Sequence, residues 1–308
     1  MKFLFVIDPI EKLNLDTDSS IEIMDECSKR DIEIYYCETK NLIFDNKKVY
    51  ADSTLIKIKD KKYEKIKSEK KELDFFDLIL MRKEPPYDLN YHYATMLLEK
   101  TKAKVINSPH GLRTANEKLV ILNFPSVIPK TLVTREEKRI LDFIDKYGKC
   151  VIKPIHLFGG QDVAILEKNN KNIRKKINKI INNEKNYAII QEFIEEVYDG
   201  DKRIFLLNGE PLGGIIRVPK KGDFRANMVI GGTPKKYAIN NNDKKIIETI
   251  KPYLIEHGLA LVGIDIIKDK LIEINVTCPT GLVPIKKLDK KNITKDIVDY
   301  LVKEAKKQ

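Results

Sequence analysis

Short apolar runs alternate with stretches of helical spacing along the first third of the chain. Buried strands are predicted at Lys2–Ile7, Ile32–Tyr36, Phe75–Met81 and Ala103–Ile106. One helix is predicted to begin at a Ser19-Ser20 cap and another to cover Tyr91–Lys100. This alternation is typical of a mostly parallel sheet. The first strand is not followed by Gly-x-Gly-x-x-Gly, which disfavours a dinucleotide-binding site.

The alternation continues in two further segments. In the middle segment, strands and helices are predicted in turn at Ser126–Val133, Glu136–Lys146, Cys150–Pro154, Asp162–Leu166, Asn172–Asn182 and Tyr187–Ile194. In the last segment, one hairpin turns at Asn208-Gly209 and a second spans Leu261–Val276. Between and after them come a Gly-rich stretch at Lys220–Pro234 and helices at Asp243–His257 and Lys295–Ala305. Because domains hold on the order of 100–200 residues, a chain of 308 residues predicts two or three of them.

Composition indicates a globular protein without a membrane-spanning segment. Apolar residues make up 42% of the sequence, and no apolar run approaches the roughly 20 residues that cross a bilayer. The start of the chain lacks a signal-peptide layout, because Asp8-Pro9 ends a short apolar run. The cysteines at 27, 37, 150 and 278 show no metal-ligand spacing. We therefore expect a cytoplasmic protein with reduced thiols and no membrane partner.

The formal charge of +11 admits two interpretations. A clustered basic surface would bind a polyanion such as nucleic acid. Lysines are instead spread from Lys2 to Lys307 and interleaved with acidic residues, and the densest run, Lys168–Lys185, reads as a helix with a solvated face. We favour the dispersed interpretation and expect no nucleic-acid partner.

The second hairpin places acidic side chains together. If its turn centres on Asp269, Asp265 lies opposite Glu273, and Asn275 shares their face while the neighbouring isoleucines fill the other. Like charges directly opposite are destabilising, and such oxygen ligands suit Mg²⁺. The alternative is the solvated polar face of an ordinary hairpin.

Several other motifs carry chemistry only in combination. Lys153 ends an apolar strand, and Gly159-Gly160 could bring backbone N–H groups to a phosphate or form a plain turn. Arg82 ends a parallel-type strand, where ligands bind in open α/β sheets. Arg225 lies in the Gly-rich stretch, which is either a surface loop or a lid.

A series of short motifs runs along nearly the whole chain. It comprises Asp8-Pro9-Ile10, Asp18-Ser19-Ser20, the run from Met81 to Asp88, Asn116-Glu117-Lys118, Ile152-Lys153-Pro154, Gly159-Gly160, the run from Asp199 to Arg203, Gly231-Gly232, Asp265, and the run from Glu273 to Thr277. In this combination the chain resembles the bacterial glutathione synthetase family of the ATP-grasp superfamily. The Asp-Pro-Ile start and the Met-Arg-Lys-Glu-Pro-Pro run are its most specific parts.

The resemblance implies an α/β ATP-grasp fold of three domains. An N-terminal parallel-sheet domain at 1–117 would hold substrate, a central lid domain at 118–194 would cover ATP, and a C-terminal domain at 195–308 would carry Mg²⁺, or Mn²⁺ in its place. The residues implied to bind ATP are Lys118, Lys153, Gly159, Gly160, Gln191, Glu192, Phe193, Ile194 and Asp201. Those implied to bind metal are Asp265, Glu273 and Asn275. Substrate would contact Ser19, Arg82, Thr277 and Cys278, and catalysis would use Arg203, Arg225 and Asn227.

The implied reaction joins γ-glutamylcysteine to glycine. ATP would phosphorylate the glycyl-side carboxylate, and the amine of glycine would displace the phosphate. The chain departs from the family pattern at 156–158, Ala226 and 278–283, which leaves another acid or amine as an alternative. Nucleotide binding without catalysis and nucleic-acid binding are the rival classes. A homo-oligomer fits the family, but no residue indicates one.

Overall fold

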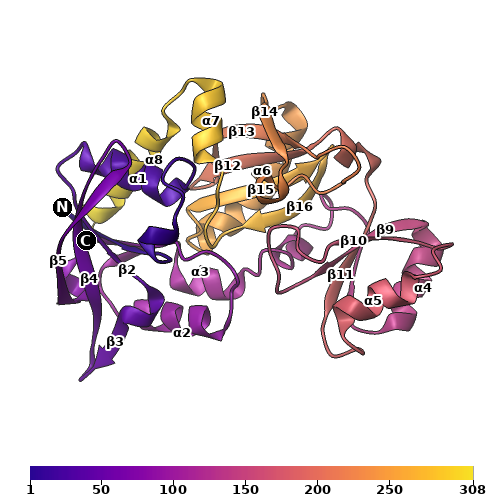
Figure 1. Cartoon of the computed structure of the whole chain (residues 1–308), viewed down its shortest axis with the longest axis horizontal. Helices are drawn as coiled ribbons and strands as arrows, with labels where there is room; N and C mark the ends of the chain where they lie inside the picture. Colours follow the sequence, from indigo (N-terminus) through magenta and orange to yellow (C-terminus); the bar gives the residue numbers. More distant parts are fainter. Residues whose placement is uncertain (308) are drawn as a thin grey trace.

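The computed structural model describes residues 1–307, which form three sheets with helices packed around them (Figure 1). The sheets follow one another along the chain and contain seven, four and five strands. The predicted α/β fold class is therefore confirmed. None of the described helices is long and apolar enough to cross a membrane.

The first sheet is parallel only in part. Its parallel strands, in the order β2-β1-β6-β7, are β2 (Glu33–Cys37), β1 (Lys2–Val6), β6 (Leu78–Met81) and β7 (Lys104–Ile106). The antiparallel strands β3 (Leu42–Asp45), β4 (Lys48–Lys59) and β5 (Lys62–Glu72) extend it beyond β2. None of these three was predicted; in β5 the mostly exposed lysines and glutamates give no apolar alternation, whereas the alternation in β4 was overlooked. The strand predicted at Phe75–Met81 is shorter, because Leu73–Phe75 forms a 3-10 turn.

Three helices belong to this first unit: α1 (Ser19–Ser28), α2 (Leu89–Leu98) and α3 (Pro109–Thr114). The cap predicted at Ser19-Ser20 is wrong by one residue. The carboxylate of Asp18 accepts hydrogen bonds from the backbone N–H groups of Ser20 at 2.6 Å and Ile21 at 2.9 Å. Asp18 therefore caps α1, as an acidic N-cap residue commonly does. Ser19 and Ser20 lie in the first turn, where both are buried.

The middle sheet is antiparallel and has a core of its own. Its strands, in the order β10-β9-β11-β8, are β10 (Ala164–Glu167), β9 (Lys149–Pro154), β11 (Ala188–Glu192) and β8 (Thr131–Thr134). Helices α4 (Glu137–Tyr147) and α5 (Ile173–Ile181) pack on it, so every predicted element of this segment is found with its type and approximate place. Its buried cluster contains only residues from this unit, between Ile140 and Ile190.

The third sheet is also antiparallel. Its strands, in the order β14-β13-β12-β15-β16, are β14 (Thr233–Lys236), β13 (Glu210–Val218), β12 (Asp201–Leu207), β15 (Leu261–Ile267) and β16 (Lys270–Asn275). The predicted turn at Asn208-Gly209 is confirmed, since φ is positive at both residues (50° and 79°). Helix α6 (Asn241–Glu256) lies against this sheet.

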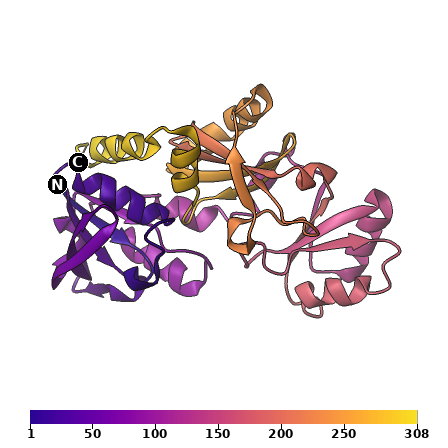
Figure 2. The ribbon, with the colours of Figure 1, turned by 45° about the horizontal axis from the view of Figure 1, so that its top comes forward.

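Two helices close the chain, α7 (Leu282–Asp289) and α8 (Ile293–Ala305). The first of them was not predicted. Figure 2 shows that α8 leaves the third sheet and lies along the N-terminal unit, so the C-terminus ends near the N-terminus. The C-terminal segment therefore packs against the first unit.

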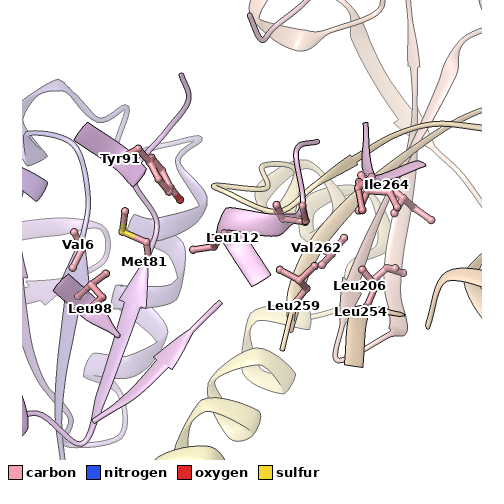
Figure 3. Packing of buried hydrophobic residues seen from close by; sticks show 14 of the residues in the cluster. Val6, Met81, Tyr91, Leu98, Leu112, Leu206, Leu254, Leu259, Val262 and Ile264 are labelled. Carbon is pink, nitrogen blue, oxygen red and sulfur yellow. The ribbon is translucent and has the colours of Figure 1, made fainter. Parts of the chain in front are cut away.

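One continuous core joins the first and third units. It runs from Val6 and Met81 through Leu112 of α3 to Val262 of β15 (Figure 3). The buried side chain of Asn107 reinforces it, because its amide donates to the carbonyls of Leu261 (2.8 Å) and Val276 (2.7 Å). The first and third units are therefore joined by one core, to which the middle sheet contributes Ile189, while the other buried residues of the middle sheet form a cluster of their own.

Candidate active site

The hairpin of β15 and β16 pairs two carboxylates as the sequence predicted. Asp265 lies directly opposite Glu273, and Asn275 lies opposite Gly263 on the same face. A bulge between Asp265 and Ile266 changes the rest of the register. The prediction that Ile272 belongs to the core face is therefore wrong. Leu271 is buried in the core instead, while Ile272 lines a cavity beside the two carboxylates.

Arginines from β12 and β13 extend this row of charges across the sheet. Arg203 lies opposite Asp265 and donates to both of its carboxylate oxygens, with its Nη2 at 2.9 Å from Oδ2. Arg217 lies opposite Asp201, donates to both of its oxygens at 2.6 Å, and also reaches Asp265 at 3.1 Å. Burial opposes ionisation of Asp265, but the two guanidinium groups hold its pKa well below the usual range.

Arg217 is a site residue that the sequence analysis missed. Its signal was the strand register: Arg217 faces Asp201 across the first hairpin, as Glu273 faces Asp265 across the second. The pairing matters because Asp201 is buried. Desolvation raises the pKa of Asp201 even though Arg217 opposes that rise.

Two lysines face the carboxylates from the other side of the site. The Nζ atom of Lys118 lies 3.3 Å from Oε1 of Glu273 and also donates to the carbonyl of Leu157. Lys153, at the end of β9, donates to Oε1 of Gln191 at 2.8 Å. Desolvation lowers the pKa of Lys153 to about 8, with Lys118 adding to the effect and Glu273 opposing it.

The donor set on this face fits a hard divalent cation in its chemistry. Asp265, Glu273 and Asn275 offer carboxylate and amide oxygens, which are the ligands that Mg²⁺ prefers. Cationic side chains neutralise the carboxylates here, and the amide nitrogen of Asn275 lies 3.4 Å from Asp265. Within residues 1–307, no three His, Cys, Asp or Glu side chains are grouped as metal ligands. A cation would therefore need the Asn275 amide to turn its oxygen inward.

The Gly-rich stretch folds over the site between β13 and β14. Arg225 forms an ion pair with Asp223 at 2.8 Å, and its Nη1 lies 3.4 Å from the carbonyl of Gly160. The φ angles of Gly159 and Gly160 are positive (63° and 80°), as a left-handed loop requires. The stretch thus contacts the glycine loop of the middle unit and covers the charged row.

A cavity of about 100 Å³ lies under this cover. Its lining includes these predicted site residues: Lys118, Lys153, Gly159, Gly160, Asp201, Arg225, Asn227, Asp265 and Glu273. Pockets for cofactor-sized ligands measure about 300–1,000 Å³. By itself this cavity is smaller than that range, but it shares Gly159, Asn227 and Glu273 with a neighbouring cavity, so the two are parts of one cleft.

The four predicted adenine-pocket residues at the end of β11 do not line this cavity. Gln191 is buried and holds Lys153, and Glu192 accepts a hydrogen bond from the backbone of Lys130 at 3.0 Å. Phe193 has the Lys149 ammonium 4.1 Å from its ring centre and packs edge-on against Phe224. Ile194 ends the segment at the start of a 3-10 turn. Their predicted contact with a nucleotide stays a prediction.

The predicted substrate residues gather at the opposite end of the site. Arg82 is buried; its Nε donates to the hydroxyl of Ser20 at 2.8 Å, and its Nη2 donates to the carbonyl of Pro279 at 3.1 Å and contacts Cys278 at 3.4 Å. Its Nη1 and the Ser19 hydroxyl are buried without a hydrogen-bond partner among residues 1–307. A buried donor without a hydrogen-bond partner destabilises the protein. These two donors would therefore suit an anionic ligand that accepts hydrogen bonds from both.

Glu117 is a further residue whose role the sequence did not reveal. Its Oε1 accepts from the backbone N–H groups of Val276 and Thr277 and from the Thr277 hydroxyl at 2.8–3.0 Å. Desolvation and the charge of Glu273 raise the pKa of Glu117. It fixes the start of the loop that carries Cys278, whose pKa burial raises to about 12. Cys278 and Thr277 line a second cavity of about 130 Å³ with Arg203, Asn227 and Asn275.

The sequence matches two models of protein families. Residues 1–113 match the N-terminal domain of prokaryotic glutathione synthetase, and residues 117–290 match its ATP-grasp domain. The glutathione synthetase of Vibrio parahaemolyticus is 37% identical over 99% of both chains. That of Prochlorococcus marinus is 39% identical over 98% of this chain and 99% of its own.

Solved structures share the fold at low sequence identity. D-cycloserine synthetase DcsG aligns over 97% of this chain and 99% of its own with a TM-score of 0.68 and 11% identity. The ATP-grasp ligase PsnB, solved with a minimal precursor, aligns over 98% of both chains with a TM-score of 0.64 and 15% identity. The predicted ATP-grasp fold is thus confirmed.

Proposed function

Since this chain belongs to the prokaryotic glutathione synthetase family, we propose that its site joins γ-glutamylcysteine to glycine, converting ATP to ADP and phosphate. The protein is an ATP-dependent ligase, as both its family and its fold indicate. The alternative of a ligase for another acid–amine pair is not favoured, because its relatives over nearly the full length are named glutathione synthetase.

The first step transfers the γ-phosphoryl group to a carboxylate oxygen. The observation that supports it most is the meeting of Lys118 and Lys153 with the row Asp265–Glu273 in one cavity. Lysine ammonium groups neutralise phosphate charge, and the backbone of Gly159-Gly160 can approach a phosphate closely. Asp265, Glu273 and Asn275 would hold Mg²⁺, with Mn²⁺ as a substitute, and the ion would neutralise phosphate oxygens.

We propose that the acid substrate binds at the end of the site formed by Arg82, Ser19, Thr277 and Cys278. The unpaired Nη1 of Arg82 and the hydroxyl of Ser19 are free to receive a carboxylate. Thr277 and Cys278 border that position, and Arg203 lies between it and the carboxylate row. Arginine–carboxylate pairing fixes orientation as well as charge, which the acyl-phosphate step requires.

The second step needs protection from water, because water would hydrolyse an acyl phosphate. Arg225 and Asn227 lie in the covering stretch and line the cavity. We assign Arg225 to stabilise the charge on the transferring phosphoryl group. We assign Asn227 to contact the same group. The glycine amine then attacks the acyl carbon and phosphate leaves.

The wider organisation follows from the same assignment. We propose domains at 1–117, 118–194 and 195–308, with ATP between the second and third. Glu192, Phe193 and Ile194 would border the adenine, and Asp201 would hold the ribose. The four cysteines are buried and reduced, in keeping with an enzyme of the cytoplasm. A homo-oligomer would fit the family.

The test is ADP release measured with all substrates and with each one omitted. The proposal predicts rapid ADP release only when γ-glutamylcysteine, glycine, ATP and a divalent cation are all present, and glutathione as the product. Turnover with another acid–amine pair, and none with this pair, would refute the proposed substrates while leaving the ligase assignment intact.

A further inference from the structure

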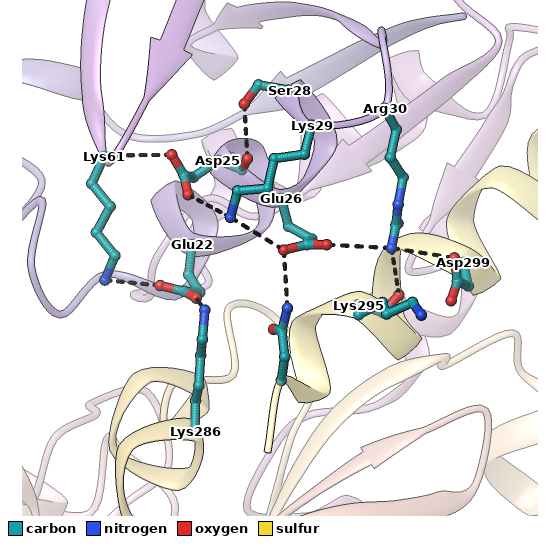
Figure 4. Close-up of polar contacts among 11 residues, drawn as sticks. Glu22, Asp25, Glu26, Ser28, Lys29, Arg30, Lys61, Lys286, Lys295 and Asp299 are labelled. Carbon is teal, nitrogen blue, oxygen red and sulfur yellow. Dashed lines mark hydrogen bonds and ion pairs between the residues drawn. The ribbon is translucent and has the colours of Figure 1, made fainter. Parts of the chain in front are cut away.

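Helix α1 carries three carboxylates that are almost fully buried although they lie outside the cavities. Glu22, Asp25 and Glu26 are exposed by only 3%, 7% and 6%. Charged groups are seldom buried unless they are paired. Figure 4 shows where their partners come from: the β4–β5 turn, the end of α1 itself, and the C-terminal helices α7 and α8. The cluster therefore joins the two ends of the chain.

Glu22 stands at the centre of this junction. One of its carboxylate oxygens pairs with the ammonium of Lys286 on α7 (Figure 4). The other pairs with Lys61 at 2.8 Å, from the turn between β4 and β5. Desolvation opposes ionisation of Glu22, but the hydrogen bonds from the two lysines lower its pKa overall. The pair thus joins the N-terminal unit to α7 and stays charged at neutral pH.

A second contact ties the same helix to α8. The Nη2 atom of Arg30, just beyond α1, lies 3.3 Å from Glu26, 3.2 Å from Asp299 and 3.3 Å from the carbonyl of Lys295. Asn292 donates to the other oxygen of Glu26 at 3.2 Å. These contacts anchor α8, whereas the pair between Glu22 and Lys286 is the ion pair that joins α1 to α7.

Helix α7 follows directly from the loop that borders the acid position. That loop, residues 277–281, is held from two sides: Arg82 donates to the carbonyl of Pro279, and Arg203 donates to that of Thr280 at 3.2 Å. At its end Gly281 has φ of 122°, which lets the chain turn into α7. A shift of α7 therefore moves the carbonyl groups that orient both arginines.

Helix α1 also contacts Arg82 directly. Ser20, two residues before Glu22, accepts the hydrogen bond from Nε of Arg82. Apolar side chains of both helices belong to one buried cluster, among them Ile21 and Ile23 of α1 and Leu282 and Ile285 of α7. Apolar packing is not directional, so it does not fix how far α7 slides along α1. A charge pair with a defined partner does fix it.

We infer that Glu22 and Lys286 are a positioning pair, which holds the loop at residues 277–281 in register with Arg82 for the acid substrate. Neither residue touches the cavities. Loss of the pair should raise KM for the acid substrate. KM for ATP should not change, because ATP would bind at the other end of the site. The identity of the acid rests on the proposed function; the geometric role of the pair does not.

The test compares Lys286→Gln with Lys287→Gln, since Lys287 is exposed on the same helix. In Lys286→Gln, Glu22 keeps its ion pair with Lys61, so the fold should persist. We expect KM for γ-glutamylcysteine to rise roughly five- to tenfold, with kcat and KM for ATP nearly unchanged. Lys287→Gln should match the unsubstituted enzyme, and Lys286→Arg should restore most of the loss, because its guanidinium can still pair with Glu22.

Hydrogen–deuterium exchange supplies a readout that does not need turnover. Backbone amides of residues 277–285 should exchange faster in Lys286→Gln than in Lys287→Gln. An unchanged KM for the acid, or equal rises for the acid and ATP, would overturn the inference whatever the exchange shows. If the unsubstituted enzyme makes no glutathione, the proposed function fails, and unchanged exchange would separately overturn the positioning role.

Discussion

The Nζ atom of Lys153 lies 2.8 Å from Oε1 of Gln191, so a neutral amide, not a carboxylate, is its hydrogen-bond partner. The two side chains come from neighbouring strands, β9 and β11, and lie two register positions apart on one face of the sheet. Burial with a neutral partner lowers the pKa of Lys153 to about 8. In the proposed function, a phosphate of ATP would supply the missing negative charge.

The first prediction concerns Lys153→Met. Loss of a hydrogen bond to a charged group costs about 1.5–3 kcal/mol, so KM for ATP should rise roughly 10- to 100-fold. Steady-state kinetics with varied ATP checks it. Lys168→Met is the control, because Lys168 lies in the same middle unit and pairs with Asp145 at the surface, outside the cavity. Equal affinity in both variants would contradict the phosphate role of Lys153.

The same pKa predicts a dependence of stability on pH. The folded-state pKa of Lys153, about 8, lies below its unfolded value near 10.5, so the unfolded chain binds more protons between these values. The contribution of Lys153 to the free energy of unfolding therefore increases as pH rises from about 8 to 10.5. Without ATP, Lys153→Met should be the more stable protein at pH 7, and its advantage should shrink by pH 10. Urea unfolding at several pH values measures this difference.

The carboxylate row gives a prediction that separates metal binding from folding. Asp265 is buried between Arg203 and Arg217, so Asp265→Asn should lower the free energy of unfolding by about 3–5 kcal/mol as well as activity. Glu273 is only partly buried and pairs with Lys118, so Glu273→Gln should raise the Mg²⁺ concentration for half-maximal activity with little loss of stability. An unchanged Mg²⁺ requirement in Glu273→Gln would argue against the proposed metal site.

The covering stretch predicts a strong effect at Gly232. A Cβ atom there would lie 1.8 Å from the carbonyl oxygen of Ala226, so Gly232→Ala cannot adopt the observed turn. Misplacement of the stretch should lower kcat by about 100-fold with little change in thermal stability. Lys221→Ala, at an exposed position in the same stretch, should remain active. Normal kcat in Gly232→Ala would show that the turn is not needed for catalysis.

Arg225 predicts a transition-state effect. Removing one donor to developing charge costs about 100- to 1,000-fold in kcat, so Arg225→Ala should lose that much while KM for ATP changes little. Its partner provides the control: Asp223, whose pKa Arg225 lowers to about 2, should be replaceable by Asn with activity retained. A rise in KM without a fall in kcat would place Arg225 in ground-state binding instead.

Much of this site was predictable because strand register is local. The pairing of Asp265 with Glu273 follows from one short hairpin, and the structure confirms it. The bulge that turns Ile272 toward the cavity was not predictable, because either register places an apolar residue in the core. Likewise, Arg217 and Asp201 face each other across a hairpin whose turn was predicted, yet its register includes a bulge after Phe205.

Contacts between distant parts of the chain could not be predicted from spacing. The pairing of Arg82 with Pro279 spans almost 200 residues and depends on how α8 returns to the first unit. Strand β5 was missed because its lysines and glutamates mask any alternation, whereas β4 does alternate and was overlooked. Helix α7 was missed because Gly281 and Pro284, at and near its start, are residues with low helix propensity.

The central claim is that this site activates the carboxylate of γ-glutamylcysteine as an acyl phosphate. It is tested most directly with γ-glutamylcysteine labelled with oxygen-18 in its cysteinyl carboxylate, followed by mass spectrometry of the products. The account predicts one labelled oxygen in the released phosphate and one in the glutathione. Unlabelled phosphate, formed alongside glutathione that keeps one labelled oxygen while the other is released as labelled water, would contradict it.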